Sequence, residues 1–305
     1  MLGYILRRLV TAPISLLIVI GVTFLILRTT GDPVQIYLDI NSTPEQEAIL
    51  RARLHLDESL FMQFVYYLRD LATGDFGQSL RFSASAMSIV MERLGYTLQL
   101  IAGALVLATV LGALGGIVSA LNKDRLPDFV ISSIAVAGQS MPSFWLGILL
   151  VQFFALYLGW LPTSGTGSWL HLILPTVTLA TFLLPNFVLI TRASMLETMG
   201  ELYVVTARAK GLPRWRVIFG HVLPNAINPT LSFLGLQLGR LVGGSVITET
   251  IFAWPGIGRL MISSIFQRDA PVVIAAVFVT SIAIILANLL VDILLSLTDP
   301  RVRLD

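Results

Sequence analysis

Residue types that could do chemistry are few and isolated in this chain of 305 residues. The three histidines, His55, His171 and His221, stand far apart in sequence and lack the spacing of metal ligands. Neither lysine, Lys123 or Lys210, follows a glycine, so the phosphate-binding loop G-x-x-x-x-G-K-[ST] is absent. There is no cysteine and no G-x-S-x-G nucleophile elbow. The sequence therefore predicts that the chain is not an enzyme and binds neither a metal nor a cofactor.

Two ionisable residues, Arg240 and Asp292, lie inside long apolar stretches. An arginine at the centre of a membrane span costs about 2.5–3.5 kcal/mol unless it meets water or a partner, so such charges are candidates for function. Arg240 could pair with Asp292, or it could line the path of a solute and meet a carboxylate there. The sequence leaves both alternatives open. A membrane-embedded protease would need a second aspartate or a Ser/His pair within the spans, and neither is found.

These residues are carried by a chain with the composition of a membrane protein. Hydrophobic residues make up 55% and charged residues 12% of the chain, about half the charged share of soluble proteins. No charged residue lies between Asp128 and Arg192. Because about 20 apolar residues span a bilayer as a helix, we expect an all-α membrane protein with six transmembrane helices. The predicted spans are 10–27, 97–121, 129–158, 170–191, 229–251 and 271–297.

The distribution of Lys and Arg predicts the orientation of these spans. With a cytoplasmic N-terminus, most basic residues of the short loops fall inside. The two short outer loops, 159–169 and 252–270, then hold only Arg259 and Arg268. Both the N-terminus and the C-terminus are therefore predicted to be cytoplasmic.

The long outer segment, 29–96, has the signals of helical structure. Thr43 followed by Pro44 and an acidic first turn predicts the start of a helix. Residues 60–71 predict a second, amphipathic helix, and 74–77 a turn. We expect a small, mostly helical cap outside the membrane.

The longest inner loop, 192–228, has the glycine and proline spacing of a folded element. Residues 201–210 are good helix formers, and Gly211 follows them as at many helix C-termini. A proline two residues later suits the first turn of a second helix, 214–222, which Pro224 is expected to end. This pattern predicts two short helices joined by a bend.

The bend in this loop is basic, with Arg208, Lys210, Arg214 and Arg216 beside it. Gly211 is expected to adopt a positive φ, which costs a residue with a Cβ about 1 kcal/mol or more. The alternative is a solvated basic loop that merely obeys the positive-inside rule. Such a loop would need no fixed shape, so the glycine and proline spacing favours a defined structural element.

This loop resembles the cytoplasmic EAA loop of permeases of bacterial ATP-binding-cassette (ABC) importers. Ala207, Gly211, Leu223 and Pro224 match the consensus E-A-A-x-x-x-G-x(9)-I-x-L-P. The chain departs from it at three positions, Val205, Thr206 and His221. Residues 206–211, TARAKG, look like the version found in the dipeptide/oligopeptide/nickel branch of these permeases.

Further segments are similar to the same branch, in the same order along the chain. They are GDFGQS at 74–79, MPSFW at 141–145, ETIFAWPGIG at 249–258 and DPRVR at 299–303. The segments ILRRL at 5–9 and GDP at 31–33 resemble the first, or B-type, permease of the pair. The resemblance covers nearly the whole chain.

The resemblance implies a type I ABC importer permease in the bacterial inner membrane. Such a subunit works with a second homologous permease, two ATPase subunits that bind ATP and Mg, and a periplasmic substrate-binding protein. The implied division is an N-terminal transmembrane helix at 1–28, a periplasmic segment at 29–96, a permease domain at 97–299 and a cytoplasmic tail at 300–305. The domain would contain a coupling loop at 199–224. Residues implied to couple to the ATPase are Thr206, Ala207, Arg208, Lys210, Gly211, Leu223 and Pro224.

Small residues recur at four-residue spacing in two spans, which lets helices approach closely. Ala104, Ala108, Gly112 and Gly116 share one face of the span at 97–121. Gly235, Gly239 and Gly243 share one face of the span at 229–251. The second face could pack within the subunit or meet the partner permease, and both alternatives stay open.

The expected function is therefore import of peptides or a related small solute, driven by ATP hydrolysis on other subunits. The substrate could be a dipeptide, a longer peptide, a glutathione-like molecule or a nickel chelate. The competing class is a self-sufficient secondary transporter or channel. That class usually has internal repeats or several intramembrane charges, and the sequence has no clear repeat of its spans.

Overall fold

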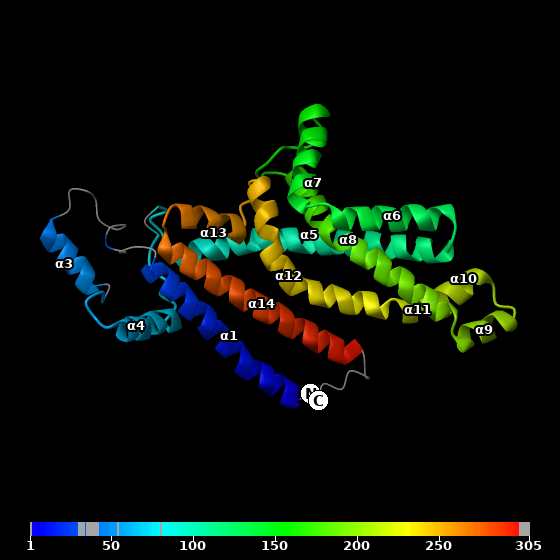
Figure 1. The fold of residues 1–305 in the computed structure, drawn as a ribbon, viewed down its shortest axis with the longest axis horizontal. Helices are drawn as coiled ribbons and strands as arrows, with labels where there is room; N and C mark the ends of the chain where they lie inside the picture. The colour runs from blue at the N-terminus through cyan, green and yellow to red at the C-terminus, as the bar shows by residue number, and fades with distance from the viewer. Residues whose placement is uncertain (1, 30–33, 35–42, 54, 80, 299–305) are drawn as a thin grey trace.

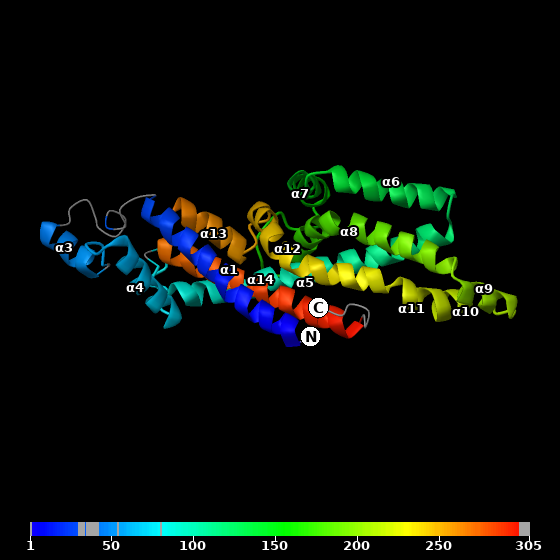
Figure 2. The ribbon, with the colours of Figure 1, turned by 60° about the horizontal axis from the view of Figure 1, so that its bottom comes forward.

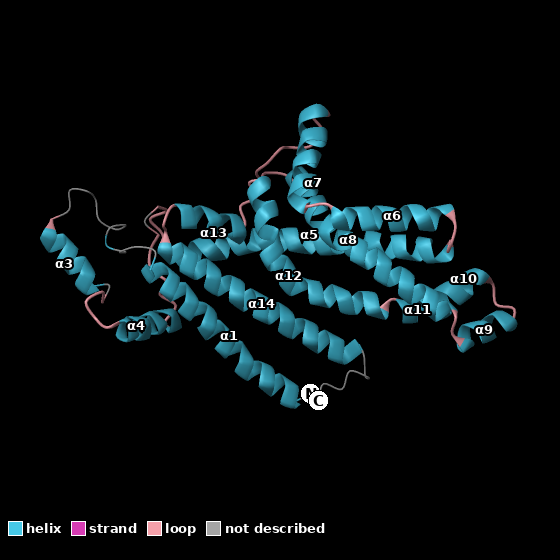
Figure 3. Ribbon diagram, in the orientation of Figure 1, coloured by secondary structure: helices cyan, strands magenta, loops and turns pink. Residues whose placement is uncertain are grey.

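A computed structural model of the chain describes residues 2–29, 34, 43–53, 55–79 and 81–298. The regular structure in these ranges is helical, apart from one isolated β-bridge between Gln78 and Ser85 (Figure 3). The motifs at 31–33 and 299–303 and the tail at 300–305 fall outside the described residues. The side chain of Asp292 is also outside them.

Five long helices form the body of the molecule. They are α1 (Leu2–Thr29), α5 (Ala86–Leu121), α8 (Leu170–Met199), α12 (Asn228–Ile251) and α14 (Ala270–Thr298). By length and composition, α5, α8 and α14 could each cross a membrane, and two bent helix pairs bring the candidate spans to five. Short helices lie at the two ends of this bundle (Figure 1). One end, called here the α13 end, has α3 (Pro44–Arg53), α4 (Leu60–Ala72) and α13 (Ile257–Phe266), and the α9 end has α9 (Leu202–Ala209) and α10 (Arg214–Val217).

The two predicted helices of the segment 29–96 are confirmed as α3 and α4. Thr43 caps α3 reciprocally: its N–H donates to Gln46 Oε1 at 3.0 Å, and the Gln46 N–H donates to Thr43 Oγ1 at 3.4 Å. Gly74 and Gly77 have positive φ angles of 78° and 80°, as the predicted turn requires. Helix α5 begins at Ala86, well before the predicted start of the span at 97.

The seam between α5 and α8 is the closest helix contact that small residues create. The α5 residues Ala104, Ala108, Gly112 and Gly116 are all buried. A Cβ on Gly112 would lie 2.3 Å from Phe187 Cβ, and one on Gly116 would lie 2.6 Å from Thr191 Cβ. Any larger residue would force the helices apart, so the small-residue face predicted for this span packs inside the chain.

The second small-residue face, formed by Gly235, Gly239 and Gly243, packs against a neighbouring helix at two of its residues and faces open space at the third. A Cβ on Gly235 would lie 2.8 Å from Val291 Cγ1, and one on Gly239 would lie 2.6 Å from Asn288 Oδ1, both on α14. Gly243 has nothing within 4 Å of its Cβ position and borders a cavity of about 90 Å³. Gly235 and Gly239 therefore pack within this chain, and contact with a partner permease remains open for Gly243.

The predicted span at 129–158, with Pro142 inside it, is bent in the structure, because the helix breaks at this proline. Helix α6 (Leu126–Ser140) ends there, and α7 (Ser143–Leu150) with the π-helical segment η1 (Val151–Tyr157) leaves it at 105°. Met141 has φ −88° and ψ 130°, the extended conformation that a following proline favours. Figure 1 shows α7 standing off the bundle.

The close contact between α5 and α8 predicts the effect of adding one methyl group at that contact. Gly116→Ala should lower the free energy of unfolding by about 1–3 kcal/mol, the usual cost of overpacking a tight contact. Gly95→Ala, in the same helix with nothing within 4 Å, should be neutral or stabilise the fold by up to about 1 kcal/mol. The measurement is the thermal denaturation midpoint of the two purified variants. Equal midpoints would contradict the close contact.

Candidate functional site

Helix α8 continues to Met199, so the loop predicted at 192–228 begins later than expected, and residues 200–227 project from the end of α8 as two short helices joined by a bend (Figure 2). The predicted first helix is confirmed as α9, and the predicted second helix as α10 followed by a π-helical segment, η2 (Ile218–Val222). The predicted end at Pro224 is wrong, because α11 (Leu223–Ala226) continues through it. Pro224 stands in the first turn of α11, directly after η2, where its missing N–H breaks no bond.

Gly211 forms the bend with the predicted backbone conformation. Its φ is 76°, in the left-handed region. Its N–H donates to the Arg208 carbonyl at 2.9 Å, which closes the last turn of α9. Nothing lies within 4 Å of its Cβ position, so backbone conformation rather than space demands glycine here. The predicted positive φ is confirmed.

The inner side of the loop rests on the ends of α5 and α8. Its buried residues form one apolar cluster with Ala120 of α5 and Met195 of α8. The members from the loop are Val204, Ala207, Val217, Ile218, Val222 and Ala226. Leu223 packs against this cluster, and Arg214 donates to the Leu121 carbonyl at 3.4 Å. The loop is therefore folded onto the helix bundle, which the alternative of a solvated basic loop does not require.

The outer side of the loop is exposed and combines basic with aromatic groups. Thr206, Arg208, Lys210 and Pro224 are exposed. Trp215 is 61% exposed, although it is a large apolar side chain. The Arg216 guanidinium lies 5.2 Å from the centre of the Trp215 ring, in cation–π geometry. This face has the rigid aromatic and arginine anchors that protein interfaces use.

Arg240 is exposed on α12, close to a bend in that helix. The helical stretches Arg214–Leu241 and Gly243–Ile251 meet at 63°. Among the described residues, Arg240 has no hydrogen-bond or ion-pair partner. The pairing with Asp292 stays a prediction, because the Asp292 side chain lies outside the described ones.

A buried carboxylate, Glu249, ties together three helices toward the α13 end. It is fully buried and accepts hydrogen bonds from Thr97 Oγ1 at 2.8 Å and from the Arg259 N–H at 3.1 Å. Ser245 Oγ donates to it at 3.2 Å. Thr97 Oγ1 in turn accepts the Ile257 N–H at 2.8 Å, so Glu249 and Thr97 together hold the start of α13. Sequence reasoning used the segment 249–258 only as a family motif and missed this role.

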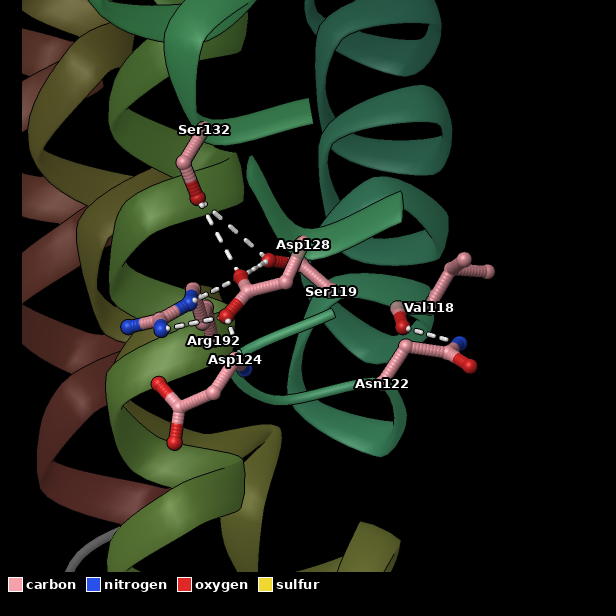
Figure 4. Close-up of polar contacts among 7 residues, drawn as sticks. All are labelled: Val118, Ser119, Asn122, Asp124, Asp128, Ser132 and Arg192. Atoms are coloured by element: carbon pink, nitrogen blue, oxygen red, sulfur yellow. Dashed lines mark hydrogen bonds and ion pairs between the residues drawn. The ribbon is translucent and has the colours of Figure 1, made fainter. Parts of the chain in front are cut away.

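A second polar cluster, also missed, lies toward the α9 end. Arg192 donates from Nε to Asp128 Oδ1 at 2.7 Å and from Nη2 to Asp128 Oδ2 at 2.8 Å (Figure 4). Asp128 and Arg192 are the charged residues at the two ends of the long uncharged stretch of the sequence. Their position at its ends was the signal from which sequence reasoning could have found them. In the part of the chain that the structure describes, no three His, Asp or Glu residues are placed to hold a metal.

The fold and the projecting loop together define the class: a polytopic helical membrane protein with a rigid two-helix element at one end. Comparison with known families then identifies it further. Residues 112–304 match the family described as "binding-protein-dependent transport system inner membrane component", and residues 1–101 match the N-terminal family of the same membrane components. The chain belongs to this family, the permeases of ABC importers.

The curated relatives include glutathione transport permeases. The chain is 38% identical to "Glutathione transport system permease protein GsiC" of Escherichia coli (strain K12), over 99% of each chain. It is 39% identical to the protein of the same name from Salmonella choleraesuis (strain SC-B67), again over 99% of each. These matches do not favour a self-sufficient secondary transporter or channel.

Solved structures support the same fold. The inward-facing methionine ABC transporter MetNI matches with a TM-score of 0.59 and 18% identity, covering 70% of this chain and 97% of that chain. An amino acid ABC transporter solved with histidines matches with a TM-score of 0.53 and 20% identity, covering 70% and 94%. The likeness to both concerns the fold alone.

Proposed function

We propose that the chain imports peptides or a related small solute such as glutathione, which a periplasmic binding protein delivers. ATP and Mg would bind two separate ATPase subunits, and a second homologous permease would complete the pathway. The observation that carries this proposal is the loop with Gly211 at its bend, folded onto α5 and α8 and exposed on its basic, aromatic face. No residue of the chain is assigned bond chemistry.

The proposed topology has six spans with both termini in the cytoplasm. Helix α1 is 28 residues long, enough to cross a bilayer core of about 30 Å. Helices α6, α7 and η1 together would form one broken span. This places the α9 end in the cytoplasm and the α13 end outside, with the segment 29–96 in the periplasm and the permease domain at 97–299.

The proposed mechanism is mechanical coupling through the loop at 199–224. The seven coupling residues named above would contact the ATPase or hold the shape that does. Of these, Ala207 and Leu223 pack inward, while the polar and basic members point outward. Closure of the ATPase pair on ATP would move the loop as a rigid element, and the spans would switch from inward-open to outward-open.

Arg240 is proposed to line the translocation path. Its exposure beside the bend of α12 supports this, because a guanidinium in a membrane needs water or an anion as a partner. Peptides and glutathione have carboxylates that an arginine can bind in bidentate geometry. The structural alternative is an ion pair between Arg240 and Asp292 across α12 and α14.

The topology can be tested with reporter fusions. A reporter placed after Gly211 should be found in the cytoplasm, and reporters at Gly74 and Gly165 should be found outside. Each of these sites lies in a loop between predicted spans. The distribution of Lys and Arg and the number of spans together predict on which side of the membrane each loop lies. A cytoplasmic signal from Gly74 would rule out the six-span topology.

Gly211→Val tests the coupling loop. A β-branched residue at positive φ is strained by about 1 kcal/mol or more, so the bend should lose its shape while the spans remain intact. We expect normal membrane abundance, with loss of ATPase subunits on purification or ATP hydrolysis without uptake of labelled peptide or glutathione.

Gly165→Val is the matched control for this strain. Gly165 also has a positive φ, 90°, and nothing within 4 Å of its Cβ position, but it lies in the proposed outer loop. It should transport and copurify normally. Normal uptake and copurification of the Gly211 variant would refute the coupling role.

Arg240→Ala tests the translocation path. At equal membrane abundance, uptake should fall by about tenfold, which corresponds to the loss of one charge-assisted hydrogen bond. Leu236→Ala, one turn away on the same helix and 56% exposed, should keep normal uptake. Reduced abundance of both Arg240→Ala and Asp292→Ala would instead support the ion pair, and wild-type uptake would remove Arg240 from the path.

A further inference from the structure

The Asp128 carboxylate is the most completely bonded group near the α9 end of the bundle. Its side chain is 6% exposed. Besides the two bonds from Arg192, it accepts from Ser119 Oγ, from Ser132 Oγ at 3.4 Å and from the Asp124 N–H at 3.0 Å (Figure 4). Five donors on two oxygens use about all the lone pairs that a carboxylate offers.

These donors come from every element that meets at this point. Ser119 lies on α5, Asp124 in the α5–α6 connection, Ser132 on α6 and Arg192 on α8. Asp128 itself is in the first turn of α6, where the helix dipole also favours a negative charge. The cluster therefore joins the α5–α6 hairpin to α8 at one site.

Helix α8 leads directly from this cluster into the loop. It ends at Met199, and α9 begins at Leu202. In the other direction, α6 leads to the bent arm formed by α7 and η1. The ion pair is thus a non-covalent link between α6, which leads to the arm, and α8, which leads into the loop.

The surrounding backbone gives this cluster little freedom to open. A Cβ on Gly116 would lie 2.9 Å from the Arg192 backbone nitrogen, so α5 and α8 are already in contact beside the pair. Opening the pair would leave the buried Asp128 carboxylate without its charged partner, which is unfavourable, although the Arg192 side chain is 28% exposed. A rigid joint fits this geometry better than a switch.

We propose that Asp128 and Arg192 are positioning residues for transport: their ion pair stays closed through the cycle and makes the α5–α6 hairpin move as one body with α8 and the loop. This inference rests on the proposed function, because it assumes that the loop receives the ATPase stroke.

The test uses the complete importer, with both permeases, the ATPases and the binding protein, reconstituted in vesicles. Uptake and ATP hydrolysis are measured together with labelled glutathione or peptide. At equal abundance, Asp128→Asn should lower uptake per ATP by about tenfold, within the range typical of coupling between two sites, while hydrolysis continues. Arg192→Lys keeps the charge but loses the two-pronged geometry, and should give an intermediate ratio.

Glu47→Gln is the matched control. It neutralises the exposed Glu47–Arg51 pair on α3, and surface pairs of this kind contribute little, so its ratio should equal that of the wild type. A wild-type ratio for Asp128→Asn, or equal losses of uptake and hydrolysis, would overturn the joint. If the wild-type complex itself shows no ATP-driven uptake, the proposed function fails instead.

A cross-link tests whether the α5–α6 hairpin itself stays closed, as movement in one body requires, and does not depend on the folding of a charge variant. The chain has no cysteine, and the Ser119 and Ser132 hydroxyl oxygens lie 3.4 Å apart. A Ser119→Cys/Ser132→Cys protein can therefore be oxidised to link α5 to α6. Uptake should stay near its reduced level after oxidation. Loss of uptake that a reductant restores would mean that α5 and α6 separate during the cycle, which would overturn the proposal that the hairpin moves as one body with α8.

Discussion

The contact between α5 and α8 is the constraint on which the rest of the structure depends. Gly112 and Gly116 remove the side chains that would hold the two helices apart. Helix α5 then carries two bonding groups, Thr97 in its N-terminal half for the buried Glu249 and Ser119 near its C-terminal end for Asp128. Inside a membrane no water is available to hydrogen-bond these polar groups. Their partners must therefore lie at fixed positions along α5. The glycines therefore set the approach of α5 and α8 at the Asp128–Arg192 cluster, and α5 also carries Thr97 of the Glu249 cluster.

Much of the fold was predictable because its signals are local. Hydrophobic runs predicted the positions of the long helices, Thr43 predicted the start of α3, and Gly211 predicted a positive φ at the loop bend. The same local reasoning placed Pro142 inside a span but gave no angle for the 105° turn of the chain there. At Pro224 it ended a helix that continues, because a π-helical segment and a new first turn accommodate the missing N–H.

The candidate site divides in the same way. The shape of the loop was predicted from its glycine and proline spacing, and its coupling residues from the family resemblance, but the ion pair joins residues 64 positions apart and the Thr97–Glu249 bond spans 152 positions. Periodicity and capping rules report on neighbours within a turn or two of helix, and give no register between helices. Only the three-dimensional packing brings these groups together. A visible trace was that Asp128 and Arg192 bound a stretch without other charges, since a charge beside a membrane needs a partner.

The charged residues discussed above differ in whether they have a partner in the structure, and the roles that we propose for them differ accordingly. Asp128, Arg192 and Glu249 have geometrically satisfied partners and join helices that lie far apart in sequence. Arg240 is exposed beside a bend, without a partner among the described residues. A charged residue that only stabilises the fold is expected to have a partner, as Asp128, Arg192 and Glu249 do, because burial of a charge without a partner is costly. The paired charges hold the helices beside the loop together, and it is the exposed Arg240 that we propose to meet the solute.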